Sequence, residues 1–299
     1  MLRLISTLSS AALFMTACAK APEMAEPEFS DALVYVLSQF DDDESELVFA
    51  ILELEKQVYL NMDVDASNPQ DRALTPERLQ AEDVEELTRP DRDPAFGIPV
   101  ALARPSVFEP DSHRHVQMLE DHTPVEPYSP DTYDRIFLDG QDCWLDRECM
   151  FLRTQQEIVK QNLLMTIPYS CKKDFRWVDL QTDNPVEEDP RWAFIARTWN
   201  EDSFVGETGK NSIVQSYSIE IWFPRDGRGF LRDGTEVNTN EGTWTSDSNG
   251  GGTLRLLSVW AETDLGGLDV SDDMVAATTR NGIDKNFKAV ESWLEENQP

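Results

Sequence analysis

The sequence predicts an α+β protein with an N-terminal helical hairpin, a Pro-rich acidic connecting region and a curved antiparallel β-sheet module that ends in a helix. Two kinds of periodicity predict this class. Apolar residues recur at helical spacing between residues 30 and 62, and they alternate with polar residues in short segments after residue 136. Composition also changes near residue 135. All eight Trp lie between Trp144 and Trp293, and all but one of the 14 Gly lie at Gly140 or later.

The predicted hairpin covers residues 30–62. Ser30 is a candidate N-cap, and Leu33, Leu37 and Phe40 follow it on one helical face. A second amphipathic segment starts near Ser45, after an acidic turn. Two such helices cannot bury both apolar stripes against each other alone, so we expect the hairpin to pack on the rest of the chain or on a partner.

Residues 63–135 form the predicted Pro-rich acidic connecting region. Pro76 can start a short helix that extends to about residue 87. Pro90, Pro94 and Pro99 argue against long regular structure after it. Apolar residues at 96–98 and 100–102 favour an ordered wrap over the main module rather than a flexible spacer.

Residues 136–299 form the predicted antiparallel β module with its C-terminal helix. Turn clusters separate the strand-like segments 161–169, 175–180, 192–199, 212–223, 229–232, 242–245 and 253–263. The last helix begins near Ser271, and its apolar stripe is Ile283, Phe287, Val290 and Leu294. This order of elements, a curved sheet and then a long helix, resembles the helix-grip lipid-binding proteins of the START-like kind. The segment Gly242-Thr243-Trp244 with the following strands resembles a lipocalin-type barrel equally well.

The N-terminus resembles a bacterial lipoprotein signal. Met1 to Arg3 are a short positive start, residues 4–17 are an apolar run too short to span a bilayer, and Met15-Thr16-Ala17-Cys18 is similar to a lipobox. The resemblance implies a signal peptide at 1–17, lipidation of Cys18 and a tether at 18–29. Ala19, where an Asp would favour inner-membrane retention, implies the outer membrane. The alternative is an ordinary secretory signal in which the cysteine stands by chance.

The net charge excludes one class of function, and the cysteines indicate a disulfide. The net charge of −31 excludes general nucleic-acid binding, which depends on Lys and Arg at phosphates. If Cys18 is acylated, three cysteines remain. In an oxidising compartment they can form one disulfide and leave one free thiol. We expect a Cys143–Cys149 disulfide with Cys171 as a buried free thiol, and a Cys149–Cys171 bridge is the alternative.

Residue types suggest two candidate metal sites. His113, His115 and His122 lie within ten residues, and an extended segment would place His113 and His115 on one face. A Zn²⁺, Ni²⁺ or Cu²⁺ site is chemically reasonable there, and three histidines in a polar loop are the alternative. The segment from Asp63 to residue 74 begins like a calcium-binding loop but has Asn and Leu at two demanding positions.

Motifs typical of enzymes are almost absent. No histidine stands in the β module to activate a Ser or Cys nucleophile. We therefore expect no catalytic residues and no cofactor. The leading hypothesis is a non-catalytic outer-membrane lipoprotein that binds an apolar ligand or an envelope partner. A metal-binding lipoprotein that uses the histidine cluster and an envelope glycan or lipid hydrolase are the alternatives.

Overall fold

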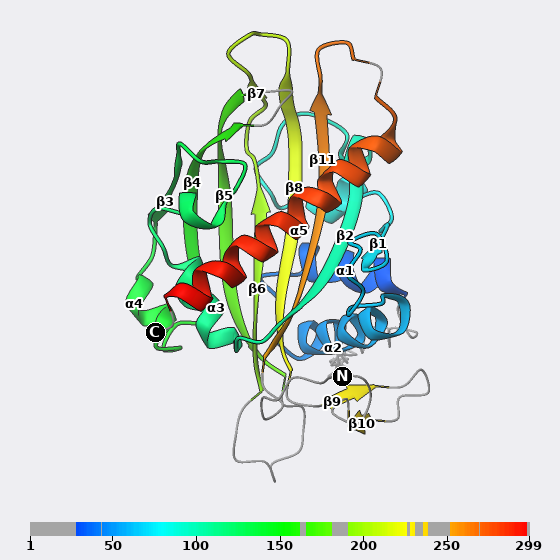
Figure 1. Cartoon of the computed structure of the whole chain (residues 1–299), viewed down its shortest axis with the longest axis vertical. Coiled ribbons are helices and arrows are strands. Elements are labelled where there is room, and N and C mark those ends of the chain that lie inside the picture. The colour runs from blue at the N-terminus through cyan, green and yellow to red at the C-terminus, as the bar shows by residue number, and fades with distance from the viewer. Residues whose placement is uncertain are drawn as a thin grey trace, which may run out of the picture.

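Figure 1 shows the computed structural model, which describes residues 28–42, 44–161, 166–180, 191–225, 228–230, 236–238, 252–268 and 270–297. The helices are α1 (Phe29–Ser38), α2 (Glu44–Asn61), α3 (Pro110–Gln117), α4 (Gln141–Leu145) and α5 (Asp272–Glu296), with 3-10 helices η1 (Ala81–Val84), η2 (Pro94–Phe96) and η3 (Thr123–Val125). The strands are β1 (Ala73–Leu74), β2 (Ile98–Ser106), β3 (Tyr133–Phe137), β4 (Phe151–Gln161), β5 (Thr166–Asp179), β6 (Trp192–Trp199), β7 (Phe204–Val205), β8 (Ser212–Pro224), β9 (Arg228–Phe230), β10 (Glu236–Asn238) and β11 (Thr253–Asp264).

Nine of these strands form one antiparallel sheet. Its order is β1-β2-β11-β8-β6-β5-β4-β3, with β7 paired to β8, while β9 and β10 pair with each other. The predicted α+β class, with N-terminal helices, a curved antiparallel sheet and a C-terminal helix, is confirmed. Within the described residues the sheet is open, because β1 pairs with β2 alone and β3 with β4 alone, which differs from a lipocalin-type barrel.

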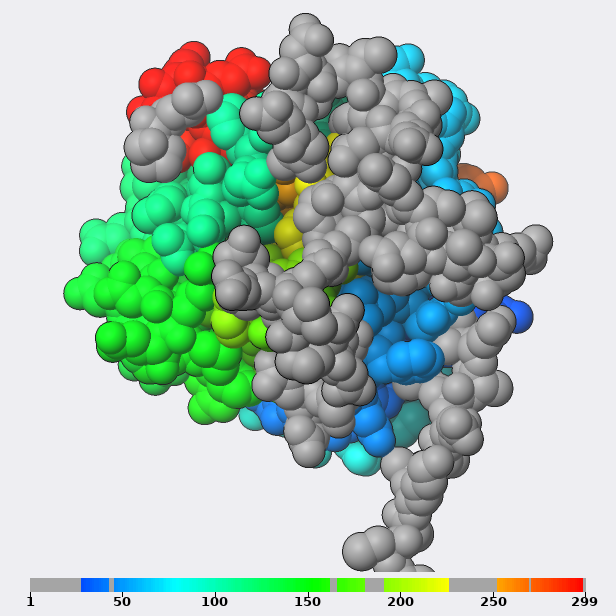
Figure 2. All heavy atoms as spheres, turned by 90° about the horizontal axis from the view of Figure 1, so that it is seen from below, coloured from blue at the N-terminus to red at the C-terminus, as the bar shows by residue number. Residues whose placement is uncertain are grey.

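The N-terminal helices cover one face of the sheet, which we call the outer face. Tyr217, Ile219, Ile221 and Phe223 of β8 point to this face and share a large apolar cluster with α1 and α2. This is the alternation expected of a half-buried strand, and it gives the hairpin a surface on which to bury its apolar stripes. Figure 2 shows the molecule end-on, with blue atoms of the N-terminal helices on one side and the red and green atoms of α5 and the α3–α4 region on the other.

Helix α5 crosses the opposite face diagonally, which we call the inner face (Figure 1). The side chain of Ser271 caps the helix by accepting a hydrogen bond from the Met274 amide. The predicted apolar stripe is buried: Ile283 and Phe287 contact β2 residues, and Val290 and Leu294 pack with α3. Helices α3 and α4 complete this layer.

Residues 63–135 are more regular than the prolines indicated. Strand β2 runs through Pro99 and Pro105 and pairs with β11 along its whole length, from Ile98 opposite Ala261 to Ser106 opposite Thr253. The sheet therefore does not begin near residue 136. The expectation was wrong because a proline in a strand removes one donor but leaves its carbonyl and its neighbours free to pair.

Three further segments differ from expectation. Residues 151–161, which we did not predict as a strand, form β4, and the predicted strand at 161–169 is divided between the end of β4 and the start of β5. The helix predicted after Pro76 is only η1. The predicted strand at 242–245, the signal peptide and Cys18 lie outside the described residues. Among the described helices, none is both long enough and apolar enough to span a membrane.

Candidate ligand site on the inner face

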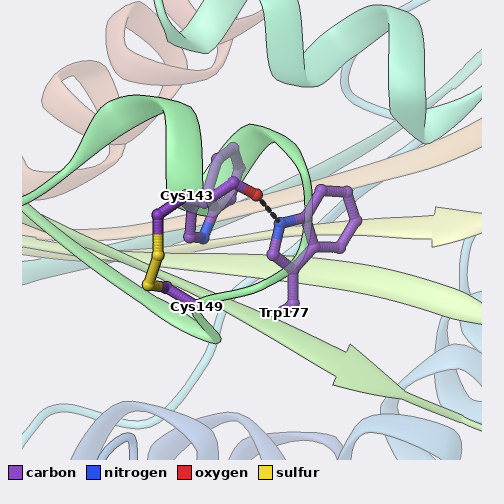
Figure 3. Close-up of a disulfide and its surroundings, with 4 residues drawn as sticks. Cys143, Cys149 and Trp177 are labelled. Atoms are coloured by element: carbon purple, nitrogen blue, oxygen red, sulfur yellow. Dashed lines mark hydrogen bonds between the residues drawn. A yellow bond between two sulfur atoms is a disulfide. The ribbon is translucent and has the colours of Figure 1, made fainter.

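An aromatic cluster occupies the inner face near α4. Trp144 of α4 stacks on Trp177 of β5 with ring centroids 5.0 Å apart, and Phe194 of β6 stacks on Trp222 of β8 at 4.1 Å. Trp177 donates a hydrogen bond through Nε1 to the Trp144 carbonyl at 3.0 Å (Figure 3). The Nε1 atoms of Trp144 and Trp222 are buried donors without a partner among the described residues.

A row of buried charges continues from this cluster across the sheet. Glu220 of β8 accepts from Arg255 of β11 at 2.7 Å and lies 3.4 Å from the Lys173 ammonium of β5. The Arg255 guanidinium lies 4.2 Å from the ring centroid of Phe287, so α5 covers one end of the row. Burial lowers the pKa of Lys173, and the carboxylate of Glu220 offsets part of that effect.

Arg135 of β3 stands at the other end of this row. Its side chain is only 4% exposed, and Nε, Nη1 and Nη2 all lack a hydrogen-bond partner among the described residues. The guanidinium lies 5.1 Å from the centroid of Phe175. Burial lowers the pKa of Arg135, and nearby Tyr133 and Cys171 offset this only in part. Burying a guanidinium without a hydrogen-bond partner lowers the stability of the folded state. A protein that keeps such a group either uses it in binding or offsets the lost stability with other interactions.

Neutral polar groups surround Arg135. The Tyr133 hydroxyl donates to Gln156 Oε1 at 2.8 Å, which leaves Gln156 Nε2 as another buried donor without a described partner. Burial raises the pKa of the Cys171 thiol to about 12, so it is protonated and donates to the same Gln156 oxygen. Burial, and after it the charges of Arg135 and Lys173, hold the pKa of His122 well below its usual value. His122 is therefore a neutral imidazole whose Nε2 has no described partner.

The predicted histidine cluster is arranged differently from expectation. Residues 110–117 are helical rather than extended, so His113 and His115 point to different sides of α3, because side chains two positions apart on a helix do not share a face. His113 is buried with Nε2 2.8 Å from Ser106 Oγ, whereas His115 is exposed. In the part of the chain that the structure describes, no group of three or more His, Cys, Asp or Glu residues is placed to hold a metal ion. The zinc and calcium hypotheses stay untested predictions.

The disulfide joins Cys143 to Cys149, the pair that the sequence favoured, and Cys171 is a buried free cysteine. The bridged loop carries Trp144 and Arg147. Arg147 has a positive φ of 57° and lies 4.5 Å from the Trp177 ring centroid. The loop thus fixes one edge of the aromatic cluster.

Sequence reasoning missed most of this site. Arg135, Gln156, Lys173, Glu220 and Arg255 are spread over five strands, and each looks like a solvent-facing residue of a half-buried strand. One signal was available: β4 carries Thr154 and Gln156 at alternate positions between the apolar Leu152 and Ile158, so its buried face mixes polar and apolar residues.

Comparisons with known proteins identify no family. No family model matches the chain, and no curated protein matches it. Among solved structures, the chain is similar to TTHA0849 from Thermus thermophilus, with 13% identity, a TM-score of 0.36 and coverage of 67% of this chain and 99% of that one. It is similar to a STAR-related lipid transfer protein (fragment 25–204) from Xanthomonas axonopodis, with 10% identity, a TM-score of 0.36 and coverage of 67% and 87%. It also resembles Ara h 8.0201, with 8% identity, a TM-score of 0.31 and coverage of 67% and 98%. At this level of similarity, none of them indicates what this chain binds.

Proposed function

We propose that this protein is a non-catalytic, lipid-anchored envelope protein that holds a small, largely apolar molecule between the inner face of its sheet and the layer formed by α3 and α5. The anchor is the lipidated Cys18 and the membrane is the outer membrane. Binding an envelope partner through the same module is the second form of the hypothesis.

The observation that carries the ligand proposal is the concentration of unsatisfied donors beside aromatic rings. The indoles of Trp144 and Trp222, the amide of Gln156 and the guanidinium of Arg135 are all buried on the inner face and have no partner among the described residues. Native proteins satisfy nearly all buried polar groups, so this group of exceptions on one face supports the proposal that another molecule supplies acceptors there. The rings beside them supply apolar contact area, which is the usual lining of a small-molecule site.

Native mass spectrometry of the protein purified from its own membrane tests this proposal. We expect a non-covalent adduct in addition to the mass of the acyl chains. Trp222→Phe removes one unsatisfied indole and should weaken the adduct, whereas Phe223→Leu, the adjacent residue of β8 on the outer face, should keep it. An adduct-free protein in every preparation, together with no uptake of added ligands, would reject the proposal.

The anchor has a separate test. Cys18→Ser should release the protein from membranes without changing its melting temperature, because the lipid is the only anchor that we propose. Fractionation with a high-salt wash checks this, and a variant that still sediments with membranes would reject lipidation.

A further inference from the structure

Arg135 differs from the other arginines of the described structure. The Nε atoms of Arg72, Arg197 and Arg255 also lack partners, but each of these residues donates through Nη2 to a carboxylate at 2.5–2.7 Å: Asp284, Asp41 and Glu220 respectively. In Arg135, none of Nε, Nη1 and Nη2 has a hydrogen-bond partner within the described part of the chain. A guanidinium is planar, and two of its N–H groups can donate parallel hydrogen bonds to two oxygens of one carboxylate or phosphate.

The carboxylates near this row are bonded elsewhere. Glu220 is shared by Arg255 and Lys173. Glu126, the next acidic side chain, accepts from Asn286 of α5 at 2.8 Å, and burial raises its pKa, which favours its neutral form. Glu291 faces the other end of the row, where His113 Nε2 lies 4.0 Å from its carboxylate. No described carboxylate is therefore hydrogen-bonded to Arg135.

We propose that Arg135, supported by Lys173, binds the anionic head group of an amphiphilic ligand, with the aromatic cluster contacting its apolar part. This inference rests on the proposed function and names the chemical class of its ligand. Lys173 lies 5.3 Å from the centroid of the same Phe175 ring that Arg135 covers at 5.1 Å, so both cations converge on one ring. Gln156 lies opposite Arg135 on the neighbouring strand, and the His122 ring centroid lies 5.1 Å from that of Tyr133, so Gln156 Nε2 and His122 Nε2 are available to orient the head group.

Alkyl compounds of equal chain length separate the head-group classes. The full chain carrying Cys18→Ser, purified without detergent, is titrated with dodecanoate, dodecyl phosphate, dodecanol and dodecyltrimethylammonium while Trp fluorescence and calorimetric heat are recorded. We expect at least one of the two anions to bind tenfold or more tightly than dodecanol, a difference of about 1.4 kcal/mol. The cationic compound should bind more weakly than either anion. Preference for dodecanoate or for dodecyl phosphate decides between a carboxylate and a phosphate ligand.

Variants connect the preference to Arg135. Arg135→Met should weaken anion binding tenfold or more and leave dodecanol binding unchanged, and Arg135→Lys should retain part of the preference. Arg153→Gln, on the exposed side of neighbouring β4, is the matched control and should bind like the unsubstituted chain. If Arg135→Met does not fold, the preference of the unsubstituted chain among the four compounds still decides the question. Equal binding of dodecanol and the anions would overturn this inference but leave the proposed function standing, and failure of every compound to bind would overturn both.

Discussion

Arg135 on the inner face of the sheet differs in its pairing from the buried arginines on the outer face. On the outer face, Glu55 of α2 accepts two hydrogen bonds from Arg191, at 2.7 and 3.0 Å, and Arg191 also donates to the Pro224 carbonyl. Arg197 is likewise paired with Asp41 at 2.6 Å. On the inner face, the Arg135 guanidinium and several neutral donors have no described partner. Both of these outer-face arginines are held by a carboxylate, whereas Arg135 is not, and this contrast is the basis of the ligand proposal.

The largest effect should come from breaking the outer-face pair. Glu55→Ala leaves the Arg191 guanidinium buried without its carboxylate, and we expect a loss of about 3–5 kcal/mol in the free energy of unfolding. Urea denaturation measures this. Asp272→Ala breaks the exposed pair with Arg78 and should cost no more than about 1 kcal/mol. Equal losses in the two variants would contradict the contrast between buried and exposed pairs.

Removing the disulfide tests how firmly the inner-face aromatics are held. Its closed loop is small, so replacing Cys143 and Cys149 with Ser should cost about 2–3 kcal/mol of unfolding free energy. Because the loop carries Trp144, near-ultraviolet circular dichroism should lose intensity even where the chain stays folded. Cys171→Ser, which changes the free cysteine, is the control for thiol loss, and an unchanged spectrum in the double variant would show that the loop does not position Trp144.

Arg135→Met should stabilise the protein, whereas the two changes above should destabilise it. Removing a buried guanidinium without a described partner relieves its desolvation penalty, so we expect the free energy of unfolding to rise by about 1–3 kcal/mol in the absence of ligand. Arg72→Met removes an equally buried guanidinium that is paired with Asp284 and should destabilise the protein instead. A loss of stability in both variants would mean that Arg135 serves the fold and not a ligand.

The smallest effect concerns pH. Burial keeps His122 neutral in the folded state by lowering its pKa, while the unfolded chain binds a proton below about pH 6.5. Unfolding therefore takes up a proton in this range, and stability falls as the pH drops below about 6.5, by at most about 1.4 kcal/mol per pH unit for one histidine. His122→Gln should reduce this slope between about pH 6.5 and pH 5, as seen in urea titrations. His115→Gln should reduce it less, because the pKa of the exposed His115 is lowered less far. Equal slopes in the two variants would refute the claim that buried, neutral His122 causes this pH dependence.

Much of the fold was determined by the sequence itself. Apolar residues at helical spacing predicted α1, α2 and α5, and alternation predicted β8. The segments of β6 and β11 were predicted as strands because turn clusters bound their apolar residues. Strand β4 was not predicted because its buried face carries Thr154 and Gln156. Strand β2 was not predicted because its prolines argued against regular structure. In both cases pairing with neighbouring strands, which no local pattern records, decided the conformation.

The disulfide also followed from the sequence, because two nearby cysteines and one distant cysteine leave few pairings. The site did not. Arg135, Lys173 and Arg255 are separated by long stretches of chain, and only the strand order of the sheet brings them to one face. A buried cation and an exposed one look alike in a sequence, since burial is set by what α3 and α5 cover. The tertiary structure alone decided that Arg197 has a carboxylate partner and that Arg135 has none among the described residues.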